Sequence, residues 1–262
     1  MATTTQHAPG TFCWPELATI DQPGAKAFYT RLFGWDAADL DMGGGESYTF
    51  FKLGGRDVGA LYTMRPEERA TGVPPHWNSY VAVTSADQAA AKAKSLGGTV
   101  ILEPMDVFDS GRMAFIQDPT GAMVGVWQAK NHPGAGVLGE TGALCWTELM
   151  TKDAAKARGF YSGLFGWSPE DRPMGPMTYT IYMNGNAQAA GMMQTTKEMG
   201  PIPSNWTIYY SVEDCDATAA KAGSLGGTIT VPPQDIPGIG RFAALQDPQG
   251  AHFSIIKLAA MA

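Results

Sequence analysis

The chain has 262 residues, of which 44% are hydrophobic and 16% charged, so it is apolar enough to form a packed core and too apolar for an intrinsically disordered protein. Its formal charge of −7, with no Lys/Arg cluster, argues against a nucleic-acid-binding protein, because the phosphate backbone is also negative. The sequence shows no secretory leader and no run of about 18 apolar residues, so we expect a cytoplasmic protein that does not interact with membranes.

The cysteines also argue against a disulfide-stabilised protein and against a zinc-knuckle protein. The cysteines are Cys13, Cys145 and Cys215, an odd number without CxxC spacing. Neither a disulfide framework nor a thiolate zinc site is expected from this pattern.

The first predicted elements form a β-α-β-β-β unit. A strand over 12–19 is followed by a helix that begins after Asp21, carries apolar residues at 3.6-residue spacing and ends at Gly34, where a glycine is a common helix terminator. The alternating runs SYTFFKLGG and RDVGALYTM then predict strands of a meander.

A second unit of the same kind follows. It is predicted as a strand over 78–83, a helix over 86–96, and strands over 99–102, 113–117 and 123–127.

The chain then repeats itself. FCWPEL at 12–17 returns as LCWTEL at 144–149, and FYTRLFGW at 28–35 returns as FYSGLFGW at 160–167. GRMAFIQDPTGA at 111–122 returns as GRFAALQDPQGA at 240–251. Blocks kept in order at nearly constant spacing indicate an internal duplication.

Two domains are therefore predicted, over 10–130 and 142–258. Each contains two β-α-β-β-β units, which gives four in the whole chain. The stretch 131–141, NHPGAGVLGET, is predicted to be the linker because it holds Gly and Pro and few large apolar residues.

The helix pattern D-x-x-x-A-x-x-F-Y-x-x-x-F-G-W and the closing turn D-P-x-G occur in both halves. Together with the doubled units they resemble the vicinal oxygen chelate superfamily, the glyoxalase, bleomycin-resistance and extradiol dioxygenase group, over nearly the whole chain. The resemblance implies an α+β fold in which four βαβββ units form two tandem glyoxalase-like domains, each with a curled sheet cup for a ligand or metal. A monomer and a homodimer are both compatible with it, because duplication can replace dimerisation.

Most residues that carry this resemblance are interpreted as structural. The aromatic residues of the helix pattern, Phe28, Tyr29, Phe33 and Trp35, lie on the apolar stripe and are expected in the core. The D-P-x-G segments have the composition of tight turns.

Metal-dependent members place His or Glu ligands on the first and last strands of each unit, and these positions can be located here by analogy. They fall on Trp14 and Trp146 in the first strands, near Asn78 and Thr207 in the strands that open the second units, and near Gly125 and Ser254 after the D-P-x-G turns. Such side chains do not complete a His/Glu-type site, so no metal and no cofactor is expected.

The histidines are few and scattered. His7 and His132 are expected at the surface and His76 at a loop edge. His252, whose counterpart is Met123, lies on a final strand and either points into the second cup or is a hydrogen-bonded structural residue.

Glu16 and Glu148 are the candidate catalytic residues. Alternate strand residues share a face, so each glutamate should point into its cup with the tryptophan two residues before it. A carboxylate in apolar company is costly unless it has a partner, and such surroundings suit acid/base work. The alternative interpretation is structural, with Glu16 bound to a backbone amide or to Arg112, and Glu148 likewise to Arg241.

The same alternation predicts ligand-binding walls, although each tryptophan could equally belong to the core. The predicted ligand-binding residues are Trp14, Asn78, Tyr80 and Trp127 in the first cup and Trp146, Thr207, Tyr209, His252 and Ser254 in the second. A mostly apolar wall with a few polar groups is typical of small-molecule pockets.

Three functions compete. The first is metal-independent binding of an apolar or aromatic small molecule in one or both cups. The alternative is a metal-independent isomerase, epimerase or lyase-type enzyme that uses a pocket glutamate as acid or base. A metal-dependent glyoxalase or dioxygenase is disfavoured by the missing ligands, since function depends on the site and not on the fold.

Overall fold

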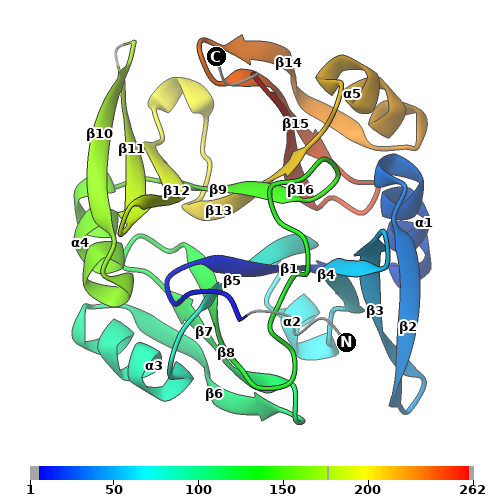
Figure 1. The fold of residues 1–262 in the computed structure, drawn as a ribbon, viewed down its shortest axis with the longest axis horizontal. Coiled ribbons are helices and arrows are strands. Elements are labelled where there is room, and N and C mark those ends of the chain that lie inside the picture. Colours follow the sequence, from blue (N-terminus) through cyan, green and yellow to red (C-terminus); the bar gives the residue numbers. More distant parts are fainter. Residues whose placement is uncertain (1–5, 176, 260–262) are drawn as a thin grey trace. The chain divides into compact units, whose positions relative to one another are not determined.

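The structure is a computed structural model, which describes residues 6–175 and 177–259 (Figure 1). The strands of the first half are β1 (Phe12–Thr19), β2 (Asp36–Gly43), β3 (Glu46–Leu53), β4 (Arg56–Thr63), β5 (His76–Ala82), β6 (Thr99–Val107), β7 (Gly111–Gln117) and β8 (Met123–Ala129). Those of the second half are β9 (Leu144–Thr151), β10 (Ser168–Met174), β11 (Met177–Asn184), β12 (Ala187–Gln194), β13 (Asn205–Ser211), β14 (Thr228–Ile236), β15 (Gly240–Gln246) and β16 (His252–Leu258). The helices are α1 (Gln22–Phe33), α2 (Pro66–Ala70), α3 (Ala86–Ser95), α4 (Ala154–Phe165) and α5 (Cys215–Ser224), with a 3-10 turn, η1, at Lys197–Met199.

Each half forms one eight-stranded sheet. The strand order is β2-β3-β4-β1-β5-β8-β7-β6 in the first half and β10-β11-β12-β9-β13-β16-β15-β14 in the second. Strand β1 runs parallel to β4, and β5 runs parallel to β8. The β3–β4 and β7–β8 pairs are antiparallel. The predicted α+β fold of two tandem glyoxalase-like domains is confirmed.

Two elements of the first half were not located from the sequence. All residues of β2 are exposed, so this edge strand shows no buried alternation. Helix α2 is short, none of its residues is buried, and its first residue is Pro66, a residue that suits the first helical turn.

Contacts group the described residues into two compact units, and each unit draws on both halves of the sequence. Unit I comprises the described residues within Met1–Trp14, Asn78–Gly134 and Thr147–Thr207, and unit II those within Pro15–Trp77, Ala135–Trp146 and Ile208–Ala262. Each unit therefore joins a first β-α-β-β-β module of one half to a second module of the other. The domain boundaries at 130 and 142 stay predictions from the sequence repeat.

The core of unit II lies where helices α1 and α5 meet the strands, and the two helices lie side by side (Figure 1, blue and orange). Phe28 of α1 packs there with Phe253. A side chain at Gly227 would approach the Phe28 ring to 3.2 Å, so the glycine after α5 lets the helix-strand connection pass close to that ring.

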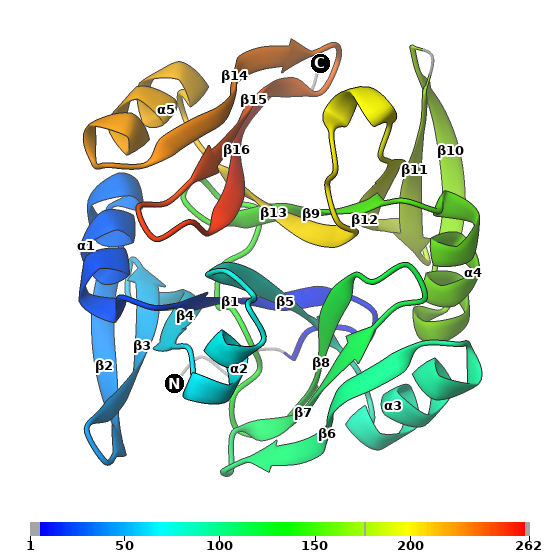
Figure 2. The same ribbon diagram turned by 180° about the vertical axis from the view of Figure 1, so that it is seen from behind.

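Unit I repeats this arrangement with helices α3 and α4 (Figure 2). Here a side chain at Gly98 would come within 2.6 Å of the Phe160 ring. The segment SLGGT occurs at 95–99 and again at 224–228, and contact between an aromatic residue of one sequence half and the backbone of the other explains its second glycine.

The tryptophan of each FGW motif fixes the chain just before a first strand. Gly34 and Gly166 both adopt a left-handed conformation, with φ of 74°, and end their helices there. Trp35 Nε1 then donates to the Gly142 carbonyl at 2.7 Å, and Trp167 Nε1 donates to the Gly10 carbonyl at 2.9 Å. These tryptophans are buried, as expected for the motif.

The D-P-x-G turn has a role beyond the turn itself. In unit II, Asp247 Oδ1 accepts hydrogen bonds from the backbone N–H groups of Gln249 and Ala251, which closes the turn. Its Oδ2 accepts a hydrogen bond from Tyr29 Oη at 3.0 Å, and Trp77 Nε1 donates to the same hydroxyl. The motif therefore couples a turn of the second half to a helix of the first.

Unit I has the corresponding arrangement. Trp206 Nε1 donates to Tyr161 Oη at 2.8 Å, and Asp118 closes its turn by accepting from the N–H groups of Thr120 and Ala122. Burial, and next the Asp118 carboxylate, raise the pKa of Tyr161 well above its ordinary value.

Asp247 gives the stability of the protein a predictable pH dependence. Burial raises the pKa of Asp247 despite its hydrogen bonds. Its ionised form therefore costs folding free energy, a cost that is absent below the unfolded-state pKa, grows as pH rises from there to the folded-state pKa, and is constant above it. We expect the unfolding free energy of the wild type, relative to Asp247→Asn, to fall as pH rises above the ordinary aspartate pKa of 3.8, as measured by urea titrations at a series of pH values. A constant difference would show that Asp247 titrates as in the unfolded chain.

Part of the predicted linker, residues 131–141, packs against the rest of unit II. Ala135 and Val137 are buried, and the Gly136 N–H donates to the Asp57 carbonyl at 2.7 Å. The segment therefore contributes to the core of unit II.

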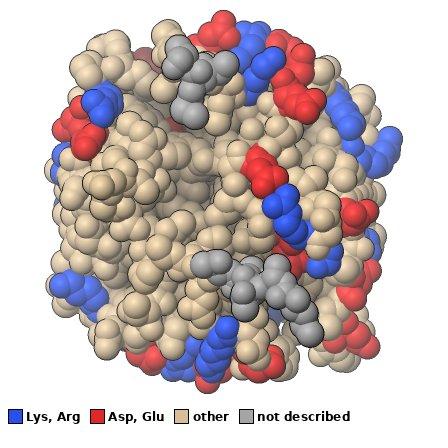
Figure 3. All heavy atoms as spheres, viewed as in Figure 1, with Lys and Arg blue, Asp and Glu red and all other residues tan. Residues whose placement is uncertain are grey.

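Charged side chains of both signs lie close together on the face seen in Figure 3. Ion pairs at the surface of the described chain include Arg56–Glu140 and Lys94–Glu103. None of the helices that the structure describes is long and apolar enough to cross a membrane.

Candidate functional site

Glu16 on β1 is bound by a tyrosine of β3. Tyr48 Oη donates a hydrogen bond to Glu16 Oε1 at 2.7 Å in unit II, and Glu16 is half-buried. The second half repeats this pair in unit I, where Tyr179 Oη donates to Glu148 Oε2 at 2.7 Å and Glu148 is buried.

The strand register explains the two pairs. Glu16 lies opposite Ala60 of β4, and Glu148 lies opposite Gly191 of β12. The intervening residue is small in both cases, which leaves space for a tyrosine of the next strand to reach the carboxylate.

The Glu16 side of the β1–β4 sheet in unit II is aromatic. Phe50 lies opposite Ala60, and Tyr48 lies opposite Tyr62, so these side chains share the face that carries Glu16. The Tyr48 and Phe50 rings are 5.0 Å apart and nearly perpendicular, and Tyr62 Oη donates to Glu68 of α2. We call the surface formed by Glu16, Tyr48, Phe50 and Tyr62 the Glu16 face.

The corresponding surface of the second half, in unit I, is less aromatic. Ile181 and Met193 take the places of Phe50 and Tyr62 beside the Glu148–Tyr179 pair. The two halves thus keep the carboxylate and its tyrosine but differ in what surrounds them.

Tyr48, Phe50, Tyr62 and Tyr179 were not singled out from the sequence. A signal was present, because SYTF at 47–50 and TYTI at 178–181 keep a tyrosine at the same place and an apolar residue two positions later on its face.

Unit I holds an aromatic cluster that includes three of the predicted ligand-binding residues. The Trp14 and His132 rings meet edge to face at 4.6 Å, and Trp127 Nε1 donates to the His132 carbonyl. Tyr80 packs against Trp127 and Phe115, with centroid distances of 6.4 and 5.2 Å. His132, expected at the surface, is instead half-buried in this cluster.

Gly125 allows the Tyr80 ring to pack closely against β8. A side chain there would come within 2.4 Å of that ring. Asn78 on the same strand as Tyr80 is also buried.

The remaining predicted residues are separated. Tyr209 and Ser254 are buried register partners on β13 and β16 in unit II, and Trp146 on β9 is half-buried. His252 is exposed and within 3.2 Å of Gln246 Nε2, and Thr207 donates to Asn205. His252 thus has the placement of a hydrogen-bonded surface residue.

The predicted arginine alternative for the two glutamates is wrong. Arg112 is held by Asp87 through two hydrogen bonds and lies within 3.6 Å of Asp106. Arg241 is held in the same way by Asp216 and Asp235. Each glutamate is instead held by a tyrosine.

Thiol chemistry is disfavoured by burial, which raises the pKa of Cys13 and of Cys145 to about 12. Burial likewise raises the pKa of Cys215 to about 11. A thiol nucleophile needs a lowered pKa.

The donor set does not fit a metal site of the kind implied by the resemblance. Indoles occupy the first-strand positions at Trp14 and Trp146, and Glu16 and Glu148 are each bound by a tyrosine. Among residues 6–175 and 177–259, no three His, Cys, Asp or Glu side chains gather in a way that could hold a metal ion.

Comparisons with known proteins agree with this fold. The chain is 43% identical over 254 residues to "Putative glyoxylase CFP32" of Mycobacterium tuberculosis, an alignment that covers 96% of each chain. It is 37% identical over 267 residues to "Anthracycline biosynthesis protein DauV" of Streptomyces sp. strain C5, which covers 97% of this chain and 95% of that one.

Among solved structures, the Mn(II)-bound glyoxalase from Novosphingobium aromaticivorans superimposes with a TM-score of 0.66 at 16% identity, covering 95% of this chain and 82% of that one. The 2,3-dioxygenase LapB from Pseudomonas sp. KL28 gives a TM-score of 0.65 at 10% identity, covering 98% and 94%. A model of the Glyoxalase/Bleomycin resistance protein/Dioxygenase superfamily matches residues 11–126 and 143–255. The chain therefore belongs to that superfamily.

Proposed function

We propose that this protein binds a flat, largely apolar small molecule without a protein-bound metal ion, and that the Glu16 face is a wall of the binding site. The observation that carries the proposal is the composition of this face, in which three aromatic rings accompany one tyrosine-bound carboxylate. Aromatic rings provide flat contact area, and a single placed polar group orients a ligand.

Two further points support the proposal. The side chains at the family's ligand positions include indoles instead of metal donors. One group of relatives is named for anthracycline biosynthesis, and anthracyclines are polycyclic aromatic compounds. Such a compound has the shape and the polar substituents that the Glu16 face would accept.

We expect 1,4-dihydroxyanthraquinone, used as a flat probe, to bind with unchanged affinity after exhaustive dialysis against EDTA. Phe50→Ala should weaken its binding about tenfold, because the lost ring contact is worth about 1.4 kcal/mol. Titration calorimetry or quenching of tryptophan fluorescence measures both effects.

Ile181→Ala, the matched substitution in the second half, is the control and should leave the affinity unchanged. Equal losses in the two variants would contradict a site on the Glu16 face. Loss of binding in EDTA that one divalent metal restores would contradict metal independence.

A second candidate function is favoured by the Glu–Tyr pairs themselves. A carboxylate held by a phenolic O–H, twice in one chain, is suited to acid/base catalysis next to a substrate carbonyl, as in isomerisation, epimerisation or elimination. In that case Glu16 or Glu148 would take the proton from carbon, and the tyrosine would fix the orientation of the carboxylate.

A further inference from the structure

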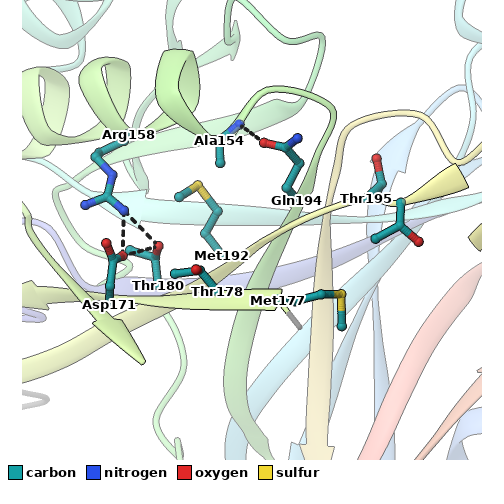
Figure 4. Close-up of a pocket in the computed structure, with 10 residues that line it drawn as sticks. Ala154, Arg158, Asp171, Met177, Thr178, Thr180, Met192, Gln194 and Thr195 are labelled. Carbon is teal, nitrogen blue, oxygen red and sulfur yellow. Dashed lines mark hydrogen bonds and ion pairs between the residues drawn. The ribbon is translucent and has the colours of Figure 1, made fainter. Parts of the chain in front are cut away.

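A groove of about 410 Å³ lies in unit I between helix α4 and strands β10–β12 (Figure 4). Its lining residues are Ala154 and Arg158 of α4, Asp171 of β10, Met177, Thr178 and Thr180 of β11, Met192 and Gln194 of β12, and Thr195 and Thr196 beyond it. Tyr179 alternates with Thr178 and Thr180, so the groove is on the opposite sheet face from the Glu148–Tyr179 pair.

In the first half the equivalent place is occupied by the side-chain amide of Gln22, the first residue of α1. Gln22 Nε2 donates to the Ser47 carbonyl, to Ser47 Oγ and to Thr49 Oγ1 at 2.9 to 3.1 Å. Gln22 Oε1 accepts a hydrogen bond from Thr63 Oγ1 at 2.9 Å. The amide thus uses both its donor and its acceptor, and Gln22 is buried.

The second half keeps polar residues at the positions that bind the Gln22 amide, but it has no glutamine at the position of Gln22. When the two FGW helices are aligned, Ala154 takes the place of Gln22 as the first helical residue. When the strands are aligned through Tyr48 and Tyr179, the partners of that amide are again polar, with Thr178, Thr180 and Gln194 in place of Ser47, Thr49 and Thr63. Figure 4 shows Ala154 and Gln194 near the top of the groove, with the Gln194 amide oxygen accepting from the Ala154 N–H.

The charged residues of the groove compensate each other. Arg158 Nη2 donates to Asp171 Oδ1 and to Thr180 Oγ1, the hydroxyl equivalent to one that binds the Gln22 amide. The lining therefore offers hydroxyls and an amide around a neutral pair, which favours an uncharged ligand able to donate and accept hydrogen bonds.

From this internal comparison we infer that the α4 groove is a second small-molecule site, which takes the primary carboxamide group of a ligand where the first half supplies the Gln22 side chain. A carboxylate lacks the N–H donors that the Gln22 amide uses and should bind less well. This inference is independent of the proposed function, because the groove and the Glu16 face share no residue.

The test is a titration of the full chain, labelled with ¹³C at the methionine methyl groups, with nicotinamide and in parallel with nicotinate. Met177 and Met192 line the groove, and single Met→Leu substitutions assign their signals. Nicotinamide should shift both signals to saturation and leave Met105 of β6 unchanged, whereas nicotinate should bind at least about tenfold more weakly.

Ala154→Gln introduces into the second half a glutamine equivalent to Gln22, which fills the corresponding place in the first half. This substitution should weaken nicotinamide binding at least about tenfold. Ala154→Leu, which fills the space without an amide, should do the same and serves if the glutamine variant does not fold. Absence of a saturable shift, equal binding of nicotinate, or undiminished binding in both variants would overturn the proposal.

Discussion

Tyr29→Phe is expected to lower the free energy of unfolding by roughly 2 to 6 kcal/mol, although it removes only one oxygen atom. That hydroxyl donates to Asp247 Oδ2 and accepts from Trp77 Nε1, and all three side chains are buried. Removing it leaves a buried carboxylate oxygen and a buried indole N–H without this partner, and each such loss costs about 1 to 3 kcal/mol. Urea denaturation followed by circular dichroism measures the change.

Tyr161→Phe is the matched substitution in unit I and should destabilise by a similar amount, because Trp206 Nε1 donates to that hydroxyl at 2.8 Å. Tyr48→Phe removes a hydroxyl from the Glu16 face and should cost less, since Glu16 is only half-buried. If Tyr29→Phe and Tyr48→Phe were equally mild, the contact between the D-P-x-G turn and α1 would contribute little to folding.

The fold was predictable because the repeat and the motifs express local rules. The αL glycines Gly34 and Gly166 end helices where the sequence indicated, and β1 is observed over the residues expected. Strand β2 was missed because the signal used was burial periodicity, and none of its residues is buried.

Contacts between the halves could not be read from either half alone. Asp247 and Tyr29 are 218 residues apart, and each belongs to a motif that has a sufficient local explanation as a turn or as a helix stripe. Only the structure shows that the hydroxyl of one motif is bound by the carboxylate of the other.

The candidate site was predictable in part. Strand alternation selected Glu16 and Glu148, and both lie beside tyrosines that sequence spacing could have revealed. Arg112 and Arg241, one of the alternatives for their partners, have the opposite charge, but both arginines are bound by aspartates. A long-range hydrogen bond between uncharged tyrosine and glutamate has no comparable charge signal in a sequence.

The two halves differ in the residues around their matching sites. Aromatic residues on the Glu16 face are replaced by Ile181 and Met193 beside Glu148, and the Gln22 amide is replaced by Ala154. Both halves thus keep the carboxylate and its tyrosine, the first with aromatic neighbours and with Gln22 filling the place of the groove, the second with aliphatic neighbours and with Ala154 beside the groove.

If the protein is an enzyme, Glu16→Gln should lower its turnover by about 10²- to 10⁴-fold, the range typical of a lost acid or base. Glutamine keeps the shape of the side chain and an oxygen that can accept the Tyr48 hydrogen bond, but it cannot take a proton from carbon. Exchange of the protons next to the carbonyl of 1-tetralone, a flat aryl ketone, followed by NMR in D₂O gives the rate. Glu148→Gln in the second half distinguishes the two sites, because the half that performs the chemistry is the one whose glutamine variant loses exchange.

Two further measurements separate a chemical role of Glu16 from a structural one. Tyr48→Phe keeps the carboxylate that would take the proton and should therefore reduce exchange less than Glu16→Gln, although the hydrogen bond that orients the carboxylate is lost. A structural role would instead lower the unfolding free energy of Glu16→Gln by roughly 1.5 to 3 kcal/mol and leave the exchange rate of the folded protein unchanged. Unchanged exchange, stability and probe affinity in both glutamine variants would remove Glu16 and Glu148 from the site.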